Sequence, residues 1–299
     1  MTNIQNFIQE KGYVLMPGGM GTELQRRGYK TKLPLWSATA NQDAFDLVSQ
    51  IHADYLIAGA DICVTNTFRT TPRAYEKAGQ VHQAREALHL AIEAAKTAQK
   101  AVSKTTFVAG SFTTLEDCYM PELVPPDDDL KREHFELVEF LVEEKVDFLL
   151  PETINSLREA KVMAQAASQS GLPFFISFVA DEEGVLLDGT PLQQVIEETD
   201  LPGRFGVSLN CRSIEVMEKS VKVLVDNYTG IKGVYPNGIG KPHDDLGWKF
   251  EEDDSSVQKF TNFILDCYES GIKILGGCCG TTPHYTDVLA KEMECKKAA

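Results

Sequence analysis

The sequence predicts an α/β fold, a single (β/α)8 or TIM barrel that occupies residues 1–299 as one domain. Short apolar runs rich in β-forming residues recur eight times, residues with helical spacing fill most of the intervals, and no linker interrupts the alternation. Eight such units in 299 residues suit a closed barrel. A doubly wound sheet is the second candidate, but no G-x-G-x-x-G fingerprint follows the first strand.

The eight predicted strands are short runs of residues that favour extended backbone and burial. In chain order they are Tyr13–Met16, Ile62–Thr65, Thr106–Ala109, Val146–Leu150, Phe174–Val179, Phe205–Leu209, Lys232–Tyr235 and Lys273–Leu275.

The helices are predicted from spacing and composition. Within 44–58 and 257–267, apolar residues recur every three or four positions, which places them on one face of a helix. Segment 82–102 is rich in Ala, Glu, Lys and Gln, as a surface helix should be. The last helix is expected to begin with Thr282 as its N-cap and Pro283 as its first residue.

Composition and charge exclude several classes of function. The chain is 43% hydrophobic, enough for a sizeable core, and its net charge of −15 disfavours nucleic acid and anionic membranes. The sequence has no apolar run of about 18 residues that could span a membrane, and segment 1–11 does not resemble a signal peptide. A cytoplasmic protein is therefore expected, with thiols free, metal-bound or catalytic. Four cysteines are expected to be core or surface thiols: Cys63, Cys118, Cys267 and Cys295.

Reactive side chains gather where the predicted strands end. In a β/α barrel the loops that follow the strands open on one face, and active sites lie there. Glu152 follows the fourth strand, Cys211 the sixth, and Cys278 and Cys279 the eighth. Three cysteines and one carboxylate are therefore expected at one mouth, although Glu152 could instead be a capping or salt-bridge residue.

The three cysteines predict a catalytic zinc site. Three thiolates with an open fourth position are typical of catalytic zinc, and zinc holds a thiol without oxidising it. Neighbouring side chains of a strand point to opposite faces, so Cys278 and Cys279 reach one metal only where the backbone leaves the extended form. Flanking glycines permit that distortion. Cys211 alone would more often be a core residue.

Such a site predicts methyl transfer to a thiol. A free thiol has a pKa near 8.5, and coordination to zinc deprotonates it. The nucleophile would be the substrate's own thiolate on zinc, so no separate protein nucleophile is expected. The donor would be a sulfonium, an ammonium or a methylated amine.

Several other residues at the mouth have two readings. Asn66 and Asn237 are either turn formers or ligand contacts. Trp36 and Trp248 lie in predicted loops, where either could stack on a cationic donor or pack locally. The long segment Thr113–Asp129, which ends in an acidic run, is either a lid or substrate loop or a solvated excursion.

Seven motifs lie in order between residues 15 and 284. They are Gly19-Met20-Gly21-Thr22-Glu23-Leu24, Pro34-Leu35-Trp36-Ser37-Ala38, Thr65-Asn66-Thr67-Phe68, Pro151-Glu152-Thr153, Asn210-Cys211, Tyr235-Pro236-Asn237 and Gly276-Gly277-Cys278-Cys279-Gly280-Thr281-Thr282-Pro283. Together they resemble the homocysteine S-methyltransferase family, and the last motif is highly specific.

The resemblance implies a barrel in which the three cysteines bind zinc. It implies that Glu152 receives the amino group of homocysteine and that backbone near Gly19 and Met20 helps to hold the amino acid, with Asn66 and Asn237 as further substrate contacts. The resemblance therefore predicts small-molecule substrates and a zinc cofactor. A monomer or small homo-oligomer is expected.

The donor is predicted from one segment. Leu35–Ala38 is most similar to the single-domain enzymes that use S-methylmethionine or S-adenosylmethionine, and it places Trp36 as a possible donor contact. The predicted reaction is methyl transfer from one of these sulfonium compounds to homocysteine, which gives methionine.

One position departs from the family pattern. The family usually has aspartate before the first glycine pair, where this chain has Pro17. A missing partner for a buried ammonium typically costs a few kcal/mol. Weaker homocysteine binding, a compensating carboxylate, another thiol or selenol acceptor, and a zinc-binding protein without turnover all remain open.

Overall fold

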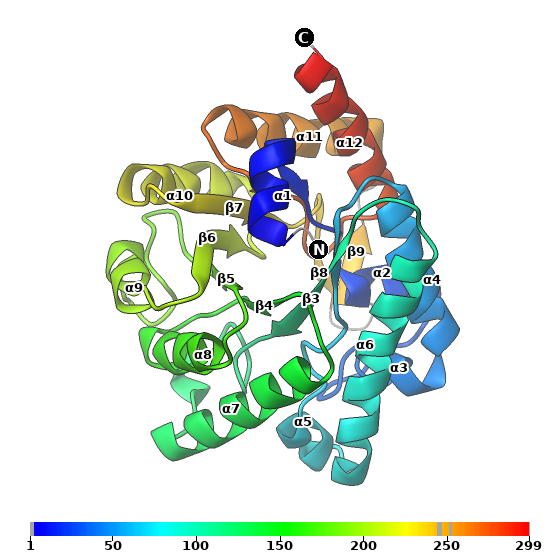
Figure 1. The fold of residues 1–299 in the computed structure, drawn as a ribbon, viewed down its shortest axis with the longest axis vertical. Helices are drawn as coiled ribbons and strands as arrows, with labels where there is room; N and C mark the ends of the chain where they lie inside the picture. Colours follow the sequence, from blue (N-terminus) through cyan, green and yellow to red (C-terminus); the bar gives the residue numbers. More distant parts are fainter. Residues whose placement is uncertain (1–2, 244–246, 251–252, 299) are drawn as a thin grey trace.

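The strands form the predicted barrel. The computed structural model describes residues 3–243, 247–250 and 253–298. Eight parallel strands form one sheet in the order β1-β10-β7-β6-β5-β4-β3-β2, with helices around it (Figure 1). The strands are β1 (Val14–Leu15), β2 (Ile62–Val64), β3 (Phe107–Phe112), β4 (Phe148–Pro151), β5 (Phe174–Phe178), β6 (Arg204–Asn210), β7 (Ile231–Tyr235) and β10 (Ile274–Leu275). All eight predicted strands are confirmed, and the pairing of β1 with β10 excludes the doubly wound sheet.

A side chain closes the barrel between β1 and β2. The Asp61 backbone N–H donates to the carbonyl of Leu15 at 2.8 Å, and Asp61 Oδ2 accepts from the Leu15 N–H at 2.9 Å. Lys11 forms an ion pair with the same carboxylate at 2.6 Å. The carboxylate therefore supplies part of the hydrogen bonding that a regular ladder would provide at this seam.

The helices form the outer layer and place their apolar faces on the sheet. They are α1 (Ile4–Lys11), α2 (Met20–Arg26), α3 (Ala40–Asp43), α4 (Phe45–Ile57), α5 (Pro72–Lys77), α6 (Ala84–Lys100), α7 (Asp127–Glu143), α8 (Leu157–Gln169), α9 (Leu192–Glu198), α10 (Ile214–Asn227), α11 (Asp254–Glu269) and α12 (Pro283–Ala298). Helices α4, α6 and α11 confirm the predicted helical segments, and α12 begins at Pro283 as expected. In the described residues, no helix is both long and apolar enough to cross a membrane.

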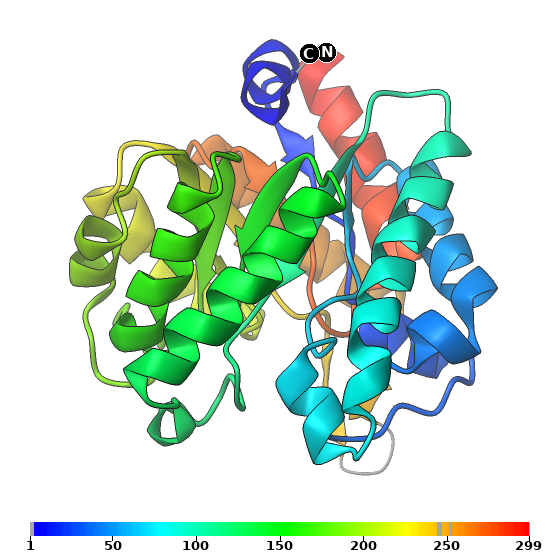
Figure 2. The same ribbon diagram turned by 60° about the horizontal axis from the view of Figure 1, so that its bottom comes forward.

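Helix α1 covers one end of the barrel. Ile4 and Ile8 pack into the apolar interior, and the ring of Phe7 meets that of Phe107 edge-on at 5.2 Å. The Asn3 side chain caps the helix, and Gly12 ends it with a positive φ. Figure 2 shows α1 beyond one end of the strands, with the loops of the other end left open. The helix thus seals the end opposite to the strand C-termini.

A hairpin that the sequence did not predict follows β7. Strands β8 (Gly240–His243) and β9 (Gly247–Phe250) pair antiparallel. Trp248, expected in a loop, therefore lies on a strand, where its side chain is buried. A Cβ on Gly280 would lie 2.2 Å from Trp248 Nε1, so the indole packs directly against the loop after β10. Of the two readings for Trp248, local packing is the one observed.

The acidic run at the end of the long loop belongs to a helix. Asp127, Asp128 and Asp129 form the first turn of α7, with Pro126 at the N-cap, so the expectation that they belong to the loop is wrong. Carboxylates are stabilised at a helix N-terminus by the helix dipole. The loop itself is 113–126 and contains a short 3-10 helix, η2 (Pro121–Leu123).

Candidate active site

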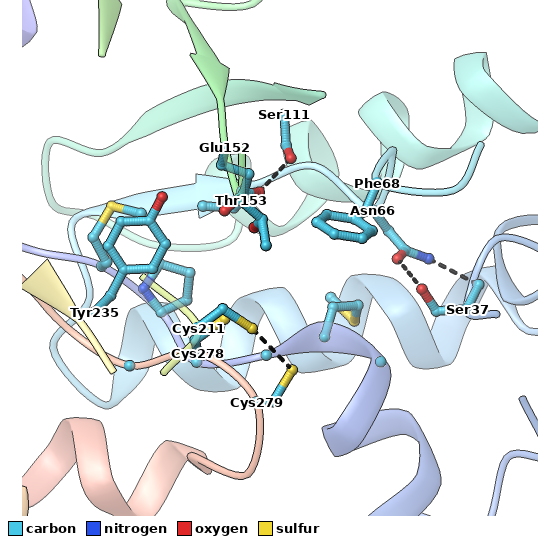
Figure 3. Close-up of a pocket in the computed structure, with 18 of the residues that line it drawn as sticks. Ser37, Asn66, Phe68, Ser111, Glu152, Thr153, Cys211, Tyr235, Cys278 and Cys279 are labelled. Carbon is cyan, nitrogen blue, oxygen red and sulfur yellow. Dashed lines mark hydrogen bonds between the residues drawn. The ribbon is translucent and has the colours of Figure 1, made fainter. Parts of the chain in front are cut away.

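A pocket of about 130 Å³ opens at the C-terminal ends of the strands. Its walls come from the C-terminal ends of β2, β3 and β7 and from the loops after β1, β2, β4, β6 and β10. They include eight residues predicted for the site: Gly19, Met20, Trp36, Asn66, Glu152, Cys211, Cys278 and Cys279. The cysteines lie on one side of the pocket and Glu152 on the other (Figure 3). The barrel thus brings together residues that are up to 260 positions apart (19 to 279).

The three cysteine sulfurs form a compact cluster. Cys211 Sγ lies 3.9 Å from Cys279 Sγ, and the sulfurs of Cys211, Cys278 and Cys279 all lie within 4.8 Å of one another. Tetrahedral zinc with Zn–S bonds of about 2.3 Å holds its sulfurs about 3.8 Å apart. The donor set and its spacing therefore fit one thiophilic metal ion.

The cluster favours one thiolate. Hydrogen bonds from Cys278 and Cys279 hold the pKa of Cys211 well below its ordinary value. The same hydrogen bonding with Cys211 raises the pKa of Cys278, and it is also the main cause that raises the pKa of Cys279. One sulfur thus ionises readily while its two neighbours keep their protons.

Backbone hydrogen bonds between neighbouring loops hold the cysteines. Cys211 follows β6 with φ +58°, a left-handed conformation that is uncommon outside glycine. The Cys278 N–H donates to the carbonyl of Pro236 at 2.7 Å, and the Gly238 N–H donates to the carbonyl of Cys279 at 2.8 Å. The loop after β7 therefore fixes the cysteine pair, whose residues lie beyond the end of β10 as the vicinal spacing requires.

The first glycine motif packs on the cysteine loop. The Gly19 N–H donates to the carbonyl of Cys278 at 2.9 Å, and the Gly280 N–H donates to Thr22 Oγ1 at 3.0 Å. A Cβ on Gly18 would lie 2.5 Å from the carbonyl oxygen of Thr281, so a glycine is needed for this close approach. The two motifs form one structural unit.

Glu152 presents a buried carboxyl to the pocket. Its backbone N–H donates to the carbonyl of Phe112 at 2.9 Å, and the Ser111 hydroxyl donates to its side chain. Asn210 braces the next residue, Thr153, through both its amide atoms at 3.2 and 2.8 Å. Burial raises the pKa of Glu152 to about 7, which a cationic ligand beside the carboxyl would reverse.

The family of the chain is identified by comparison with models of known protein families. The model of the family described as homocysteine S-methyltransferase matches residues 14–293. The chain belongs to the homocysteine S-methyltransferase family. This confirms the resemblance and the enzyme class expected from the motifs.

Relatives of the chain match it over nearly its whole length. A homocysteine S-methyltransferase of Bacillus subtilis, YbgG, is 25% identical and aligns over 97% of both chains. The homocysteine methyltransferase MmuM of Escherichia coli superimposes in its oxidised form with a TM-score of 0.84 at 24% identity, covering 98% of this chain and 100% of that one. Its metallated form gives a TM-score of 0.83 at 24% identity, with 97% and 99% covered. The structural similarity therefore covers the complete barrel.

Asn66, predicted as a substrate contact, has a buried amide that the protein itself engages. Ser37 Oγ donates to Asn66 Oδ1 at 2.7 Å, and Asn66 Nδ2 donates to the Ser37 carbonyl at 3.0 Å and to Asn41 Oδ1 at 2.8 Å. Asn66 therefore holds the segment that carries Trp36, which lines the pocket with φ +52°.

Asn237, the other predicted amide contact, is not among the residues that line the pocket. Its backbone N–H donates to the carbonyl of Arg212 at 2.9 Å. Its buried Oδ1 has no hydrogen-bond partner within the described part of the chain. The structure thus places the Asn237 backbone beside Arg212, the residue after Cys211.

Two tyrosines belong to the site although no role was predicted for them. Tyr235 lines the pocket, and its hydroxyl points to the side of Glu152 (Figure 3). Tyr119, from the loop 113–126, reaches the sulfur of Cys211. Tyr235 lies in one of the motifs and could have been singled out, whereas Tyr119 carries no signal in the sequence.

Proposed function

We propose that this protein is a zinc-dependent enzyme that transfers a methyl group from S-methylmethionine or S-adenosylmethionine to the sulfur of homocysteine. The observation that carries the proposal is the placement of three cysteine sulfurs opposite one buried carboxyl in a single pocket. Membership of the family supports the transfer to homocysteine. The chemistry of the pocket supports the metal and the class of donor.

The reaction exchanges one S–C bond for another. The acceptor thiol gives up its proton, and its sulfur forms a bond to the methyl carbon as the bond between that carbon and the donor sulfur breaks. The bonding pair stays on the donor sulfur, which becomes a neutral thioether. The products are methionine, the demethylated donor and one proton.

Cys211, Cys278 and Cys279 would hold the zinc ion. When bound, zinc lowers the pKa of a thiol that joins it, so that the thiol is ionised at neutral pH. Three protein ligands leave room for one substrate group, as in other catalytic zinc sites. The metallated form of MmuM, among the structural relatives, supports a metal in this barrel.

Glu152 would orient the acceptor through its amino group, and the start of α2 would receive the carboxylate. The first N–H groups of a helix have no partner within it. The N–H of Gly19 already donates to the carbonyl of Cys278, so the N–H groups of Met20 and Gly21 are the better placed for a substrate. Both residues line the pocket.

Tyr235 would take the place of the missing aspartate. With Pro17 in the wall, Glu152 is the single carboxylate among the described lining residues. The buried Tyr235 hydroxyl has no hydrogen-bond partner of normal geometry in the described residues. Burial and then the charge of Glu152 raise the pKa of Tyr235, so the hydroxyl stays neutral and can accept from an ammonium. The loss of one charge is then partly offset.

The aromatic side of the pocket suits a sulfonium donor. Trp36 and Phe68 line it, and the faces of aromatic rings attract cations. The positive charge disappears when the methyl group leaves, so a neutral aromatic wall releases the thioether product readily.

A methyl-transfer assay tests the proposal. Zinc-loaded protein would be given homocysteine with S-methylmethionine, S-adenosylmethionine or betaine in parallel, and methionine would be measured. We expect methionine from one of the two sulfonium donors and none from betaine. No methionine from any donor, with about one zinc bound per chain, would contradict the proposal and favour another thiol or selenol acceptor or a binding role.

A cysteine variant tests the metal separately. Cys278→Ser should lose bound zinc and methyl transfer together, because two thiolates hold the ion far less tightly than three. Cys295→Ser is the matched control, since Cys295 is exposed on α12. Turnover unchanged in Cys278→Ser would rule out the zinc mechanism.

A further inference from the structure

The loop 113–126 is anchored at its first residues. The Leu115 N–H donates to Glu159 Oε1 at 2.8 Å. The carboxylate of Glu116 lies 3.1 Å from the guanidinium of Arg73 on α5. These contacts join the loop to two helices that pack outside the barrel.

The middle and the far end of the loop are also held. Asn155 Nδ2 donates to the carbonyl of Asp117 at 3.2 Å, and Arg158 donates to the carbonyl of Val124 at 2.9 Å. Asp117 also forms a tight turn, since its Oδ1 accepts from the Tyr119 N–H at 2.8 Å. The loop is therefore held along its length by α5, by α8 and by the segment after β4.

The tip of this loop brings a phenol to one of the cysteines. Tyr119 has an exposed ring, with 46% of the residue accessible, yet its hydroxyl lies 3.0 Å from Cys211 Sγ and 3.2 Å from the Cys211 carbonyl oxygen. The hydroxyl donates to the carbonyl oxygen or to a Cys211 thiolate, and a protonated Cys211 thiol can donate to the hydroxyl oxygen. Both acceptors belong to Cys211, so either bond restrains the same residue.

Cys211 is the cysteine that most needs such a restraint. It adopts a left-handed backbone conformation, and it follows β6 as a single cysteine, whereas Cys278 and Cys279 are consecutive. A hydrogen bond to a thiolate also draws charge from the sulfur. In a site with several thiolates, that would leave the substrate sulfur as the stronger nucleophile.

We propose that Tyr119 is a positioning residue for the cysteine cluster, whose hydroxyl orients Cys211 and moderates the charge on its sulfur. This inference rests on the proposed zinc site. Partners of metal ligands that hold a ligand in place typically contribute about 10–100-fold to metal affinity or activity.

The test removes only the hydroxyl. Tyr119→Phe keeps the ring on the loop and loses both hydrogen bonds to Cys211. Tyr29→Phe is the matched control, because its hydroxyl bonds Thr39 Oγ1 at 2.9 Å outside the pocket. Zinc affinity would be measured at one pH by competition with a chromogenic chelator. The sulfur-to-metal absorption band would be recorded with cobalt(II) in place of zinc, and kcat and KM would be determined on the zinc-loaded proteins.

We expect Tyr119→Phe to bind zinc at least about tenfold more weakly and to shift the cobalt band, while Tyr29→Phe stays within about twofold of the wild type. Unchanged affinity and an unchanged band in Tyr119→Phe would overturn the inference. A lower kcat with both unchanged would also overturn it, since Tyr119 would then act on the substrate. If the wild type itself binds no zinc, the proposed function fails first, and the two failures are distinguishable.

Discussion

At the scale of single residues, Glu152 is a buried carboxyl whose ionisation would respond to a cationic ligand. The carboxyl is buried, is hydrogen-bonded by Ser111 and has its pKa raised to about 7, mainly by burial. An ammonium group in the pocket would stabilise the ionised form and lower that pKa. In the proposed reaction, amino acid binding and the ionisation of Glu152 are therefore coupled.

This coupling predicts a pH dependence. Because the folded carboxyl holds its proton up to about pH 7, binding of the acceptor below that pH must first remove it. The KM for homocysteine should then rise by up to about tenfold per pH unit below 7. Thiol ionisation and zinc loss also respond to acid, so the KM of Glu152→Gln over the same range is the reference.

Glu152→Gln should raise the KM about 10–100-fold at pH 8, because a hydrogen bond to a charged partner is lost. Its KM should also vary less with pH than that of the wild type. Glu122→Gln, on η2 and at the surface, is the control. A KM unaltered in Glu152→Gln would remove Glu152 from the acceptor site.

At the scale of elements, the site depends on how closely the loop after β1 approaches the loop after β10. Tyr55 on α4 donates from its hydroxyl to the carbonyl of Thr281 at 2.8 Å, so that oxygen is held in place. Gly18 lies directly against it. The contact leaves no room for a side chain.

Gly18→Ala should therefore destabilise the protein. The added Cβ would lie 2.5 Å from the Thr281 carbonyl oxygen and 2.7 Å from the Tyr55 hydroxyl. The hydrogen bond between these two atoms restrains both of them. We expect a loss of about 1–3 kcal/mol in the free energy of unfolding, measured with urea. Gly110→Ala on β3 is the matched control, since its nearest neighbours are side-chain ends of Val146 and Leu141. Equal losses in both variants would contradict the steric argument.

The elements that the sequence predicts are those with one dominant local signal. The strands of the barrel are buried on both faces and appear as apolar runs, and the long helices have clear spacing. The β8–β9 hairpin was missed because its two short strands, Gly240–His243 and Gly247–Phe250, contain Gly, Pro and Lys and no apolar run. Helix α1 had usable signals in Asn3 and Gly12.

The residues of the candidate site likewise fall into those that the sequence predicts and those that it does not. The cysteine pair stands out because glycines surround it, and Glu152 because it follows a buried strand. Tyr119 could not be predicted, since contacts of its loop with Arg73, Glu159 and Arg158 fix its position. The engagement of the Asn66 amide by Ser37 and Asn41 likewise depends on packing between distant segments.

At the scale of the whole molecule, the two ends of the barrel differ in role. One end is sealed by α1, and the other carries the pocket. Between them lies an apolar interior, where Phe148 and Phe175 each meet the ring of Phe205. We therefore expect the protonation of buried groups outside the pocket to change the free energy of unfolding and not the rate of turnover.

His52 on α4 is such a group, and it predicts acid sensitivity. Burial lowers the pKa of His52 to about 4 in the folded protein, from 6.5. Between these values the unfolded chain binds the proton more readily, so stability is present above about pH 6.5 and is lost as the pH falls towards 4. The loss should reach about 3 kcal/mol at most.

Urea unfolding of His52→Gln between pH 7 and 4 tests this. The variant should lose less free energy of unfolding over that range than the wild type, whatever its stability at pH 7. His82→Gln, at the surface of η1 (Val81–Gln83), should follow the wild type. Parallel curves for all three proteins would show that His52 does not titrate on unfolding.

The pairing of β1 with β10 has a consequence for protein synthesis. Strand β1 leaves the ribosome first, and its neighbour β10 follows 260 residues later (14 to 274), just before the sulfurs of Cys278 and Cys279. Until then the nascent barrel has an unpaired edge at β1 and a single thiol, Cys211, of the three. A growing chain thus contains no complete cysteine cluster, and the three sulfurs come together only in the step that closes the barrel.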